Sequence, residues 1–257
     1  MPPRDYELAL VMPVYNEEGC IAAVVRSWRD MLCASGINFV MIVINDGSRD
    51  GTAGILQGFA GDERIRVIHQ ANAGHGPTVL KGYGQAVTLA DWVFQCDSDN
   101  EMGPDSFGRL WEIRHEADAV FGHRQHRKQN FQRSLISLGS RMTVEWFFGR
   151  GIEDVNTPYR LMRSSVLGPI LECIAPDTLA PNVILCGALT FAGVRVRSVP
   201  VPCRPRQTGR ASIVRWKLWR VAVRSFSQTL RCSRQIRRSQ LRDRCAAGIL
   251  DATARVR

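Results

Sequence analysis

Residues 92–101 read Trp-Val-Phe-Gln-Cys-Asp-Ser-Asp-Asn-Glu, an apolar run that ends abruptly in three carboxylates. Asp97 and Asp99 are two positions apart, so on an extended backbone their side chains point to the same side. Glu101 follows closely, and all three can converge on one hard cation. Mg²⁺ and Mn²⁺ prefer such oxygen ligands, usually shared with the phosphates of a substrate. The alternative is a solvated turn after a buried strand, and the motif alone leaves both interpretations open.

The length of the chain, 257 residues, indicates one large α/β domain or one domain with a tail. The sequence contains no run of 18 or more apolar residues, so we expect no membrane-spanning helix. The N-terminus does not read as a signal peptide, because its apolar stretch is short and runs into Pro13. The eight cysteines form no Cys-x-x-Cys pair, and we expect them to be reduced thiols in a cytoplasmic protein that is not secreted.

The positive charge of the chain is concentrated near its C-terminus. Residues 203–257 contain 15 Lys and Arg against 2 Asp and Glu, which is +13, so the other residues carry −3 of the total of +10. We expect a catalytic domain over residues 1–212 and a basic amphipathic helical tail over residues 213–257. Within the tail, apolar residues recur at helical spacing: Trp216, Trp219, Val223, Phe226 and Leu230. Such a stripe flanked by arginines suits an anionic membrane surface; packing against the domain is the main alternative.

Strand and helix patterns alternate along the chain. The expected strands are 8–12, 39–44, 65–69, 92–96 and 117–122, with two more within 155–162 and at 194–199. The expected helices are 18–34, 52–59, 77–89, 105–116, 135–148 and 182–192. This alternation predicts an α/β fold with parallel strands and helices on both faces, in which ligands bind beyond the carboxyl ends of the strands.

Polar clusters follow the expected strands at these ends. In the cluster after the first strand, Tyr15 is suited to lie against a nucleobase, and Glu17 can accept hydrogen bonds from a base or ribose. Asp46, after the second strand, can do the same. The residues that follow it are expected to cap the next helix: Ser48, Asp50 and Thr52. The basic stretch 123–128 can clamp phosphate, or it is a solvated loop.

Four motifs in this order carry a family resemblance: Pro-x-Tyr-Asn-Glu, Asn-Asp-Gly-Ser-x-Asp-Gly-Thr, Asp-x-Asp and Gly-x-Arg. Over residues 8–213 the chain resembles family 2 glycosyltransferases of the GT-A fold, in particular the dolichyl- or polyprenyl-phosphate mannosyltransferase group. The resemblance implies a Rossmann-like, mostly parallel sheet and a Mg²⁺ or Mn²⁺ cofactor. It also implies transfer of a hexose, with inversion, from a GDP- or UDP-sugar to a polyprenyl or dolichyl phosphate.

The resemblance assigns roles to matching residues. Contacts to the nucleotide sugar are implied for Pro13, Tyr15, Glu17, Ile44, Asp46, Asp97, Ser98, Asp99, Arg124 and Arg206. Metal ligation is implied for Asp97, Asp99 and Glu101. Contacts to the acceptor are implied for Arg160, Arg206, Arg210 and Ser212. The residues expected to act in catalysis are Asp97, Asp99, Arg124 and Asp154. Asp154 would be the base if the acceptor were a hydroxyl group.

Two positions depart from the family pattern. Asn45 replaces the first residue of the usual Asp-Asp pair, and Ser212 stands where lipid-phosphate synthases have Lys. A sugar or other hydroxyl acceptor therefore stays an alternative. A nucleotidyltransferase would need a Gly-rich basic loop after the first strand, where this chain has an acidic one. A nucleic-acid-binding protein is suggested by the tail but not by the mildly acidic body. The expected location is peripheral, on the cytoplasmic face of a membrane; no oligomeric state is predicted.

Overall fold

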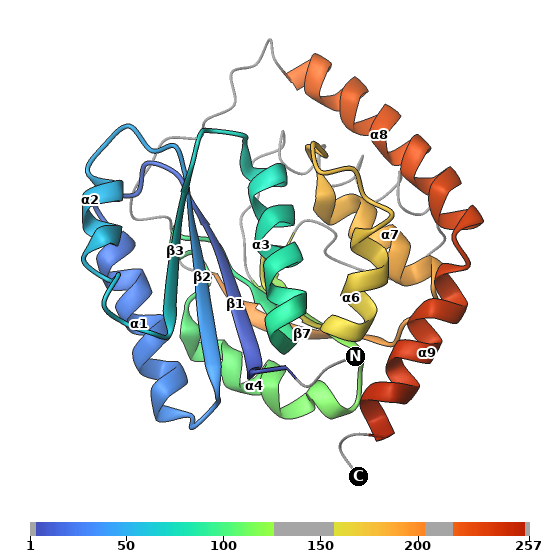
Figure 1. Ribbon diagram of the computed structural model, residues 1–257, viewed down its shortest axis with the longest axis horizontal. Helices are drawn as coiled ribbons and strands as arrows, with labels where there is room; N and C mark the ends of the chain where they lie inside the picture. The colour runs from blue at the N-terminus through green and yellow to red at the C-terminus, as the bar shows by residue number, and fades with distance from the viewer. Residues whose placement is uncertain (1–3, 126–156, 204–217, 255–257) are drawn as a thin grey trace.

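The computed structural model describes residues 4–125, 157–203 and 218–254, in which seven strands form one sheet (Figure 1). The strand order is β3-β2-β1-β4-β6-β5-β7. The strands are β1 (Tyr6–Val14), β2 (Phe39–Asp46), β3 (Ile65–Gln70), β4 (Ala90–Gln95), β5 (Ala119–Gln125), β6 (Arg160–Arg163) and β7 (Val196–Pro202). Neighbouring strands pair in parallel except β6, which runs antiparallel to both β4 and β5. The mostly parallel α/β fold expected from the sequence is confirmed.

The sheet separates two hydrophobic cores, because successive side chains of a strand face opposite sides. On β1, Leu8 and Leu10 face one core, whereas Ala9 and Val11 face the other. The first core is covered by α1 (Ile21–Ala34), α2 (Thr52–Gln57) and α4 (Phe107–Glu112). The second is covered by α3 (His75–Leu89), α6 (Ser164–Leu171) and α7 (Pro181–Phe191), as Figure 1 shows. The parallel strands β1, β2, β3 and β4 therefore end together at one edge.

Three helical segments differ from the expectation. Helix α6 was not predicted, since its eight residues include Gly168 and Pro169, which are poor helix formers. The helix expected over 105–116 is a short α4 flanked by 3₁₀ turns at Pro104–Ser106 and Ile113–His115. The helix expected over 135–148 lies outside the described residues.

The described part of the C-terminal tail packs on the domain. It forms α8 (Leu218–Arg238) and α9 (Leu241–Ala254). Cys232, Ile236, Leu241 and Cys245 belong to the same buried core as α3 and α6. Of the predicted apolar stripe, only the side chain of Leu230 is described, and it is partly buried. The predicted boundary at residue 212 also falls outside the described residues, so the division into two units stays a prediction.

Of the helices described, none combines the length and the apolarity that crossing a lipid bilayer requires.

Helix α3 crosses the sheet closely at Gly82. A Cβ there would lie 2.3 Å from Cγ1 of Val11 and 3.1 Å from Cδ1 of Ile44, both fully buried. Gly84, on the same helix, has nothing within 4 Å of its Cβ position. The same substitution at these two glycines therefore tests how closely helix and sheet approach.

We expect Gly82→Ala to lower the free energy of unfolding by about 1–3 kcal/mol, because it overpacks the core. Gly84→Ala should instead raise it by about 0.5–1 kcal/mol, because alanine is the better helix former. Urea denaturation followed by circular dichroism measures both. Equal effects of the two substitutions would contradict the close crossing at Gly82.

Candidate functional site

The loops that follow β1 and β2 are joined by hydrogen bonds. The N–H of Asn16 donates to Oγ of Ser48 at 3.0 Å, and its Oδ1 accepts from the N–H of Arg49 at 2.8 Å. The N–H of Glu17 donates to Oγ1 of Thr52 at 2.9 Å. These contacts make the ends of the two strands a single connected edge.

The expected capping of α2 is therefore partly wrong. Ser48 and Thr52 accept from the neighbouring loop, and the N-cap position is Gly51, which has no side chain. Asp50 does both, since its carboxylate accepts from the N–H of Thr52 at 3.1 Å and from that of Glu18 at 3.3 Å. The carboxylate of Glu18 in turn accepts from Gly51 N–H at 2.6 Å. Long-range partners thus replace the local ones.

Asp46 is buried at the end of β2, and its carboxylate holds the loop that leads into α3. Oδ1 accepts from the N–H of Ala73 at 2.8 Å, and Oδ2 accepts from that of Gly74 at 2.9 Å. The side chain of Gln70 donates to Oδ1 at 2.8 Å. Three donors already engage this carboxylate, so its geometry is that of a loop support. Direct recognition of the nucleoside by Asp46 stays a prediction.

A second layer of polar residues, which we did not predict, supports the same loop. Gln70 also donates to Oγ1 of Thr78 at 2.9 Å, and it accepts from Nζ of Lys81 at 3.0 Å. The hydroxyl of Thr78 donates to the carbonyl of Gly74 at 2.9 Å. Gln70 stands opposite Asp46 in the register of β2 and β3. Alignment of the two strand ends is the sequence signal that could have found it.

Asn45, the departure from the family pattern, is buried and paired with His69. Its amide nitrogen lies 3.0 Å from Nδ1 of His69, and its Oδ1 accepts from the N–H of Ser48 at 3.1 Å. An amide can donate to a neutral imidazole, which a carboxylate cannot do. The partner residue on β3 therefore gives a physical reason for Asn at this position.

Asp97 follows β4 and differs from Asp46 in lacking partners. Its Oδ1 is buried and has no hydrogen-bond partner among the described residues. Burial raises the pKa of Asp97, and the carboxylates of Asp99 and Glu101 raise it further, whereas His75 and Arg124 lower it. A bound cation would satisfy this oxygen and favour the ionised carboxylate.

The metal-ligand roles of Asp97, Asp99 and Glu101 stay predictions. No group of three His, Cys, Asp or Glu side chains that could hold a metal occurs in the described part of the chain. Asp99 turns back to accept from the N–H of Glu101 at 3.0 Å, across Asn100 with φ of +57°. Glu101 Oε2 lies 4.0 Å from the thiol of Cys203. The backbone from Asp99 to Glu101 thus forms a tight turn and does not continue the strand.

Two basic side chains, those of His75 and Arg124, act electrostatically on Asp97. Arg124 lies near the end of β5, and its Nε is buried without a hydrogen-bond partner in the part of the chain that the structure describes; the same holds for Nδ1 of His123. His75 opens α3 and is exposed. The position of His75 at the start of α3 depends on the tertiary fold and not on a local sequence pattern.

The thiol of Cys20 contacts both Glu17 and Ser98. This thiol lies 3.3 Å from Oε2 of Glu17 and 3.5 Å from the carbonyl of Ser98. Both Glu17 and Ser98 are buried, whereas Tyr15 is 37% exposed and free to contact a ligand. The loop after β1 and the loop after β4 thus form adjoining walls of one site.

Two residues with implied ligand contacts are core residues. Ile44 pairs with Pro13 in the register of β2 and β1, and its side chain is fully buried beneath α3. Arg160 is also fully buried; its Nε donates to the carbonyl of Thr157 at 2.6 Å, and its guanidinium lies over the ring of Phe121. Both side chains therefore contribute to the core, and their implied ligand contacts stay predictions. Four other predicted residues lie outside the described residues: Asp154, Arg206, Arg210 and Ser212.

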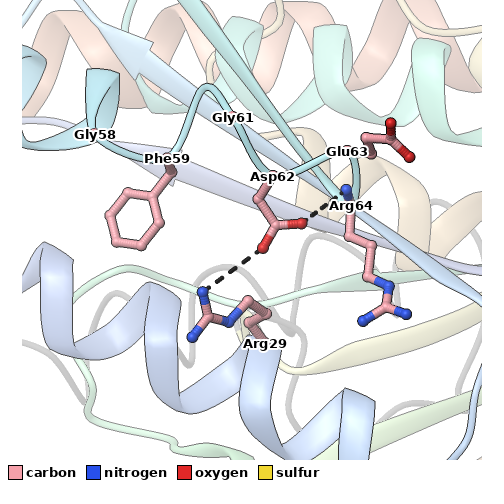
Figure 2. Close-up of a pocket in the computed structure, with 7 residues that line it drawn as sticks. All are labelled: Arg29, Gly58, Phe59, Gly61, Asp62, Glu63 and Arg64. Atoms are coloured by element: carbon pink, nitrogen blue, oxygen red, sulfur yellow. Dashed lines mark hydrogen bonds and ion pairs between the residues drawn. The ribbon is translucent and has the colours of Figure 1, made fainter.

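A hollow of about 500 Å³ lies at the opposite end of the sheet (Figure 2). The carboxylate of Asp62 in this hollow already has partners within the chain. It lies 3.6 Å from the guanidinium of Arg29 and accepts from the N–H of Arg64 at 3.0 Å. This end holds the amino end of β3, where ligands of such sheets do not bind. The carboxyl-end cluster around Asp97 is therefore the candidate site.

The sequence pattern of the family described as Glycosyl transferase family 2 matches residues 9–167, more than half of the chain. The chain belongs to this family. The match includes every described loop of the candidate site from β1 to β5.

One curated protein with a similar sequence is an undecaprenyl-phosphate 4-deoxy-4-formamido-L-arabinose transferase of Pseudomonas paraeruginosa. It is 29% identical over 186 residues, which are 70% of this chain and 54% of that protein. The chain thus spans about half the length of this relative.

Two solved structures share the fold. One is glucosyl-3-phosphoglycerate synthase of Mycobacterium tuberculosis, in complex with Mn²⁺, UDP-glucose and phosphoglyceric acid. It has a TM-score of 0.63 at 17% identity, over 88% of this chain and 80% of that chain. The other is mannosyl-3-phosphoglycerate synthase of Rubrobacter xylanophilus, with a TM-score of 0.62 at 15% identity, over 92% and 80%. At these identities the likeness establishes the GT-A fold of this family 2 member.

We expect Asp46→Ala to lower the free energy of unfolding by roughly 1.5–3 kcal/mol, since it leaves buried donors without their charged acceptor. Asp62→Ala removes a partly exposed carboxylate near the amino end of β3 and should cost less than about 1 kcal/mol. Chemical denaturation of both variants measures the difference. A cost for Asp46→Ala no larger than that for Asp62→Ala would contradict the support role.

Proposed function

We propose that the protein transfers a sugar from a nucleoside diphosphate sugar to a polyprenyl phosphate. The single observation that carries this proposal is the buried, partnerless oxygen of Asp97 at the carboxyl end of the sheet of a family 2 glycosyltransferase. The basic side chains of His75 and Arg124 both lower the pKa of the same carboxylate, which burial raises. An anionic ligand with a bound cation would complement both the carboxylate and the basic side chains.

The donor diphosphate and a divalent metal fit this site together. Asp97 and Asp99 would hold Mg²⁺ or Mn²⁺, with diphosphate oxygens completing the ligand set. When bound, the metal offsets the negative charge that grows on the leaving diphosphate. Arg124 would add a fixed donor to the same phosphates, and the positive end of α3 lies beside them. The Mn²⁺ and UDP-glucose named for the mycobacterial structure support this choice of ligands.

The acceptor is proposed from the curated relative, which is described as an undecaprenyl-phosphate sugar transferase. A phosphate acceptor is already ionised near neutral pH, so its oxygen needs no general base. That oxygen would form a bond to the anomeric carbon as the bond from this carbon to the diphosphate oxygen breaks. A single displacement of this kind inverts the anomeric centre. The leaving diphosphate would carry away the negative charge that the acceptor oxygen loses.

A membrane surface is the proposed location of this acceptor. Helix α8 presents exposed arginines along its C-terminal half: Arg231, Arg234, Arg237 and Arg238. Arginines near an anionic bilayer contribute electrostatic attraction that falls with salt. The apolar side of this half-helix is buried in the domain through Cys232 and Ile236. The proposed docking is therefore electrostatic in the described part of the helix.

We expect Asp97→Asn and Asp99→Asn each to lower turnover by at least ~10²-fold, as for loss of a key electrostatic contact. Asp105→Asn, at an exposed carboxylate of the neighbouring 3₁₀ turn, should have little effect. The assay measures nucleotide release from UDP- and GDP-sugars with undecaprenyl phosphate. EDTA should abolish release, and Mn²⁺ or Mg²⁺ should restore it.

Full activity of Asp97→Asn or in EDTA would contradict the metal-diphosphate site. Transfer to a water-soluble hydroxyl acceptor but not to undecaprenyl phosphate would retain the donor site and reject the lipid acceptor.

Anionic membrane docking can be measured by flotation of the full chain with phosphatidylglycerol vesicles. The double substitution Arg234→Gln with Arg238→Gln should weaken binding roughly 10- to 30-fold, given about 1 kcal/mol for each arginine. Arg66→Gln with Arg109→Gln removes the same charge from exposed positions elsewhere and should change binding little. Equal loss in both double variants, or no flotation of the unaltered chain at low salt, would contradict docking through α8.

A further inference from the structure

Helix α8 is fastened to the loop between α6 and α7 by one glutamine side chain. Oε1 of Gln228 accepts from the N–H of Leu179 at 3.1 Å, and its Nε2 donates to the carbonyl of Asp177 at 3.1 Å. One turn earlier, Arg224 pairs with the carboxylate of Asp177 at 2.8 Å. This ion pair is exposed and therefore weak. The amide with its two backbone contacts defines where the 177–179 segment sits.

The same 177–179 segment packs closely against the first turn of α3. A Cβ added at Gly76 would lie 2.3 Å from the carbonyl oxygen of Thr178 and 2.6 Å from that of Leu179. Both atoms belong to backbone and cannot turn aside as a side chain would. The backbones of α3 and the 177–179 segment therefore pack so closely that residue 76 has no room for a side chain. A shift of the segment would change this contact at the start of α3.

The first turn of α3 is part of the candidate site. Gly74, which precedes the helix, is held from the other side by the carboxylate of Asp46. The N–H of Ala73, one residue earlier, is held by the same carboxylate, and His75, the residue after Gly74, opens α3. The start of α3 is therefore clamped between Asp46 on one side and the segment fastened by Gln228 on the other.

We propose that Gln228 is a positioning residue for the candidate site, acting through the 177–179 segment on the first turn of α3. It touches no substrate. The nature of the ligand rests on the proposed function, but the mechanical link does not. The C-terminal helix would then be part of the working site, and contacts made by α8 elsewhere would affect donor binding.

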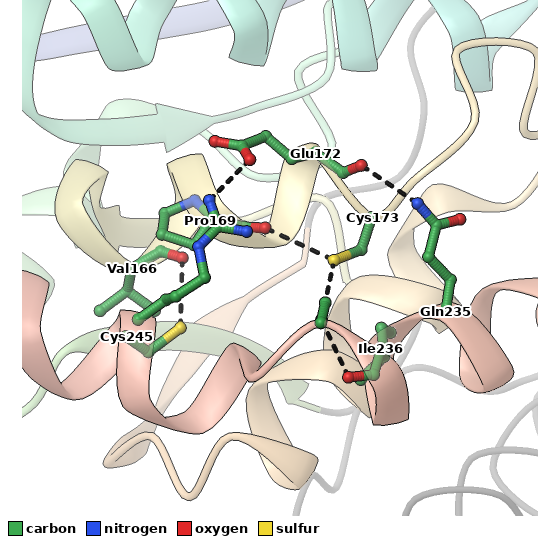
Figure 3. Close-up of polar contacts among 9 residues, drawn as sticks. Val166, Pro169, Glu172, Cys173, Gln235, Ile236 and Cys245 are labelled. Carbon is green, nitrogen blue, oxygen red and sulfur yellow. Dashed lines mark hydrogen bonds and ion pairs between the residues drawn. The ribbon is translucent and has the colours of Figure 1, made fainter.

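Gln235 provides a matched control on the same helix. Its Nε2 donates to the carbonyl of Glu172 at 3.4 Å, at the far end of α6 (Figure 3). Gln235→Leu and Gln228→Leu are the same chemical change, and each removes contacts of α8 to backbone. Of these two glutamines, Gln228 is the one that contacts the segment next to α3.

The test compares the two variants in the full chain by two measurements. Hydrogen exchange followed by mass spectrometry reports on the backbone amides of residues 74–80, with no reference to activity. Titration with UDP, and separately with GDP, in the presence of Mn²⁺ reports on the site. Gln228→Leu should speed exchange in 74–80 and weaken nucleotide binding about 5- to 10-fold, the scale of one or two lost hydrogen bonds. Gln235→Leu should change neither.

Donor kinetics add a readout that general destabilisation would not move. For Gln228→Leu the donor KM should rise while kcat changes less, and Gln228→Glu, which keeps the acceptor for Leu179 N–H, should recover part of the affinity. Gly76→Ala disturbs the same contact from the α3 side and should reproduce the exchange result, which serves if Gln228→Leu does not fold.

Equal exchange in 74–80 for the Gln228 and Gln235 variants would overturn the proposal. So would faster exchange with unchanged nucleotide affinity. Faster exchange in a protein whose unaltered form binds neither UDP nor GDP would support the link between α8 and α3, and it would reject the proposed donor instead.

Discussion

The carboxylate of Asp46 accepts hydrogen bonds from two consecutive backbone N–H groups, those of Ala73 and Gly74, and from the amide of Gln70. Hydrogen bonds to a buried charge are stronger than neutral ones, so this group can hold a loop in one conformation. Through it, β2, β3 and the start of α3 form one unit. The position of His75, and with it the field around the candidate site, depends on this contact.

Asp97 lies at the same edge of the sheet but differs from Asp46 in its hydrogen bonding. Asp46 has all its partners within the chain, whereas Oδ1 of Asp97 is buried and has none in the described residues. Burying a charged oxygen without a partner is costly, and this cost is the physical basis for proposing a cation at Asp97. Two carboxylates that look equivalent in the sequence thus differ in whether the chain itself supplies their partners.

The described C-terminal segment has an exposed basic side and a buried apolar side. Its net positive charge predicts an anionic partner, and the arginines in the C-terminal half of α8 are exposed. Its apolar side nevertheless joins the core shared with α3 and α6. The two interpretations that the sequence left open therefore describe opposite sides of the same helix in its described part. Gln228 adds a polar link from this helix toward the site.

The sequence by itself determined the alternation of strands and helices, the parallel sheet and the edge at which polar loops gather, because periodicity and spacing are local properties. It also predicted Asp97 and Arg124 as site residues, and the fold places Asp97 after β4 and Arg124 near the end of β5. Only the tertiary structure decided the antiparallel insertion of β6, the burial of Ile44 and Arg160, and the support of Asp46 by Gln70. The physical reason is that these outcomes depend on partners distant along the chain. A side chain's donors, acceptors and exposure are then set by what folds against it, which no local pattern records.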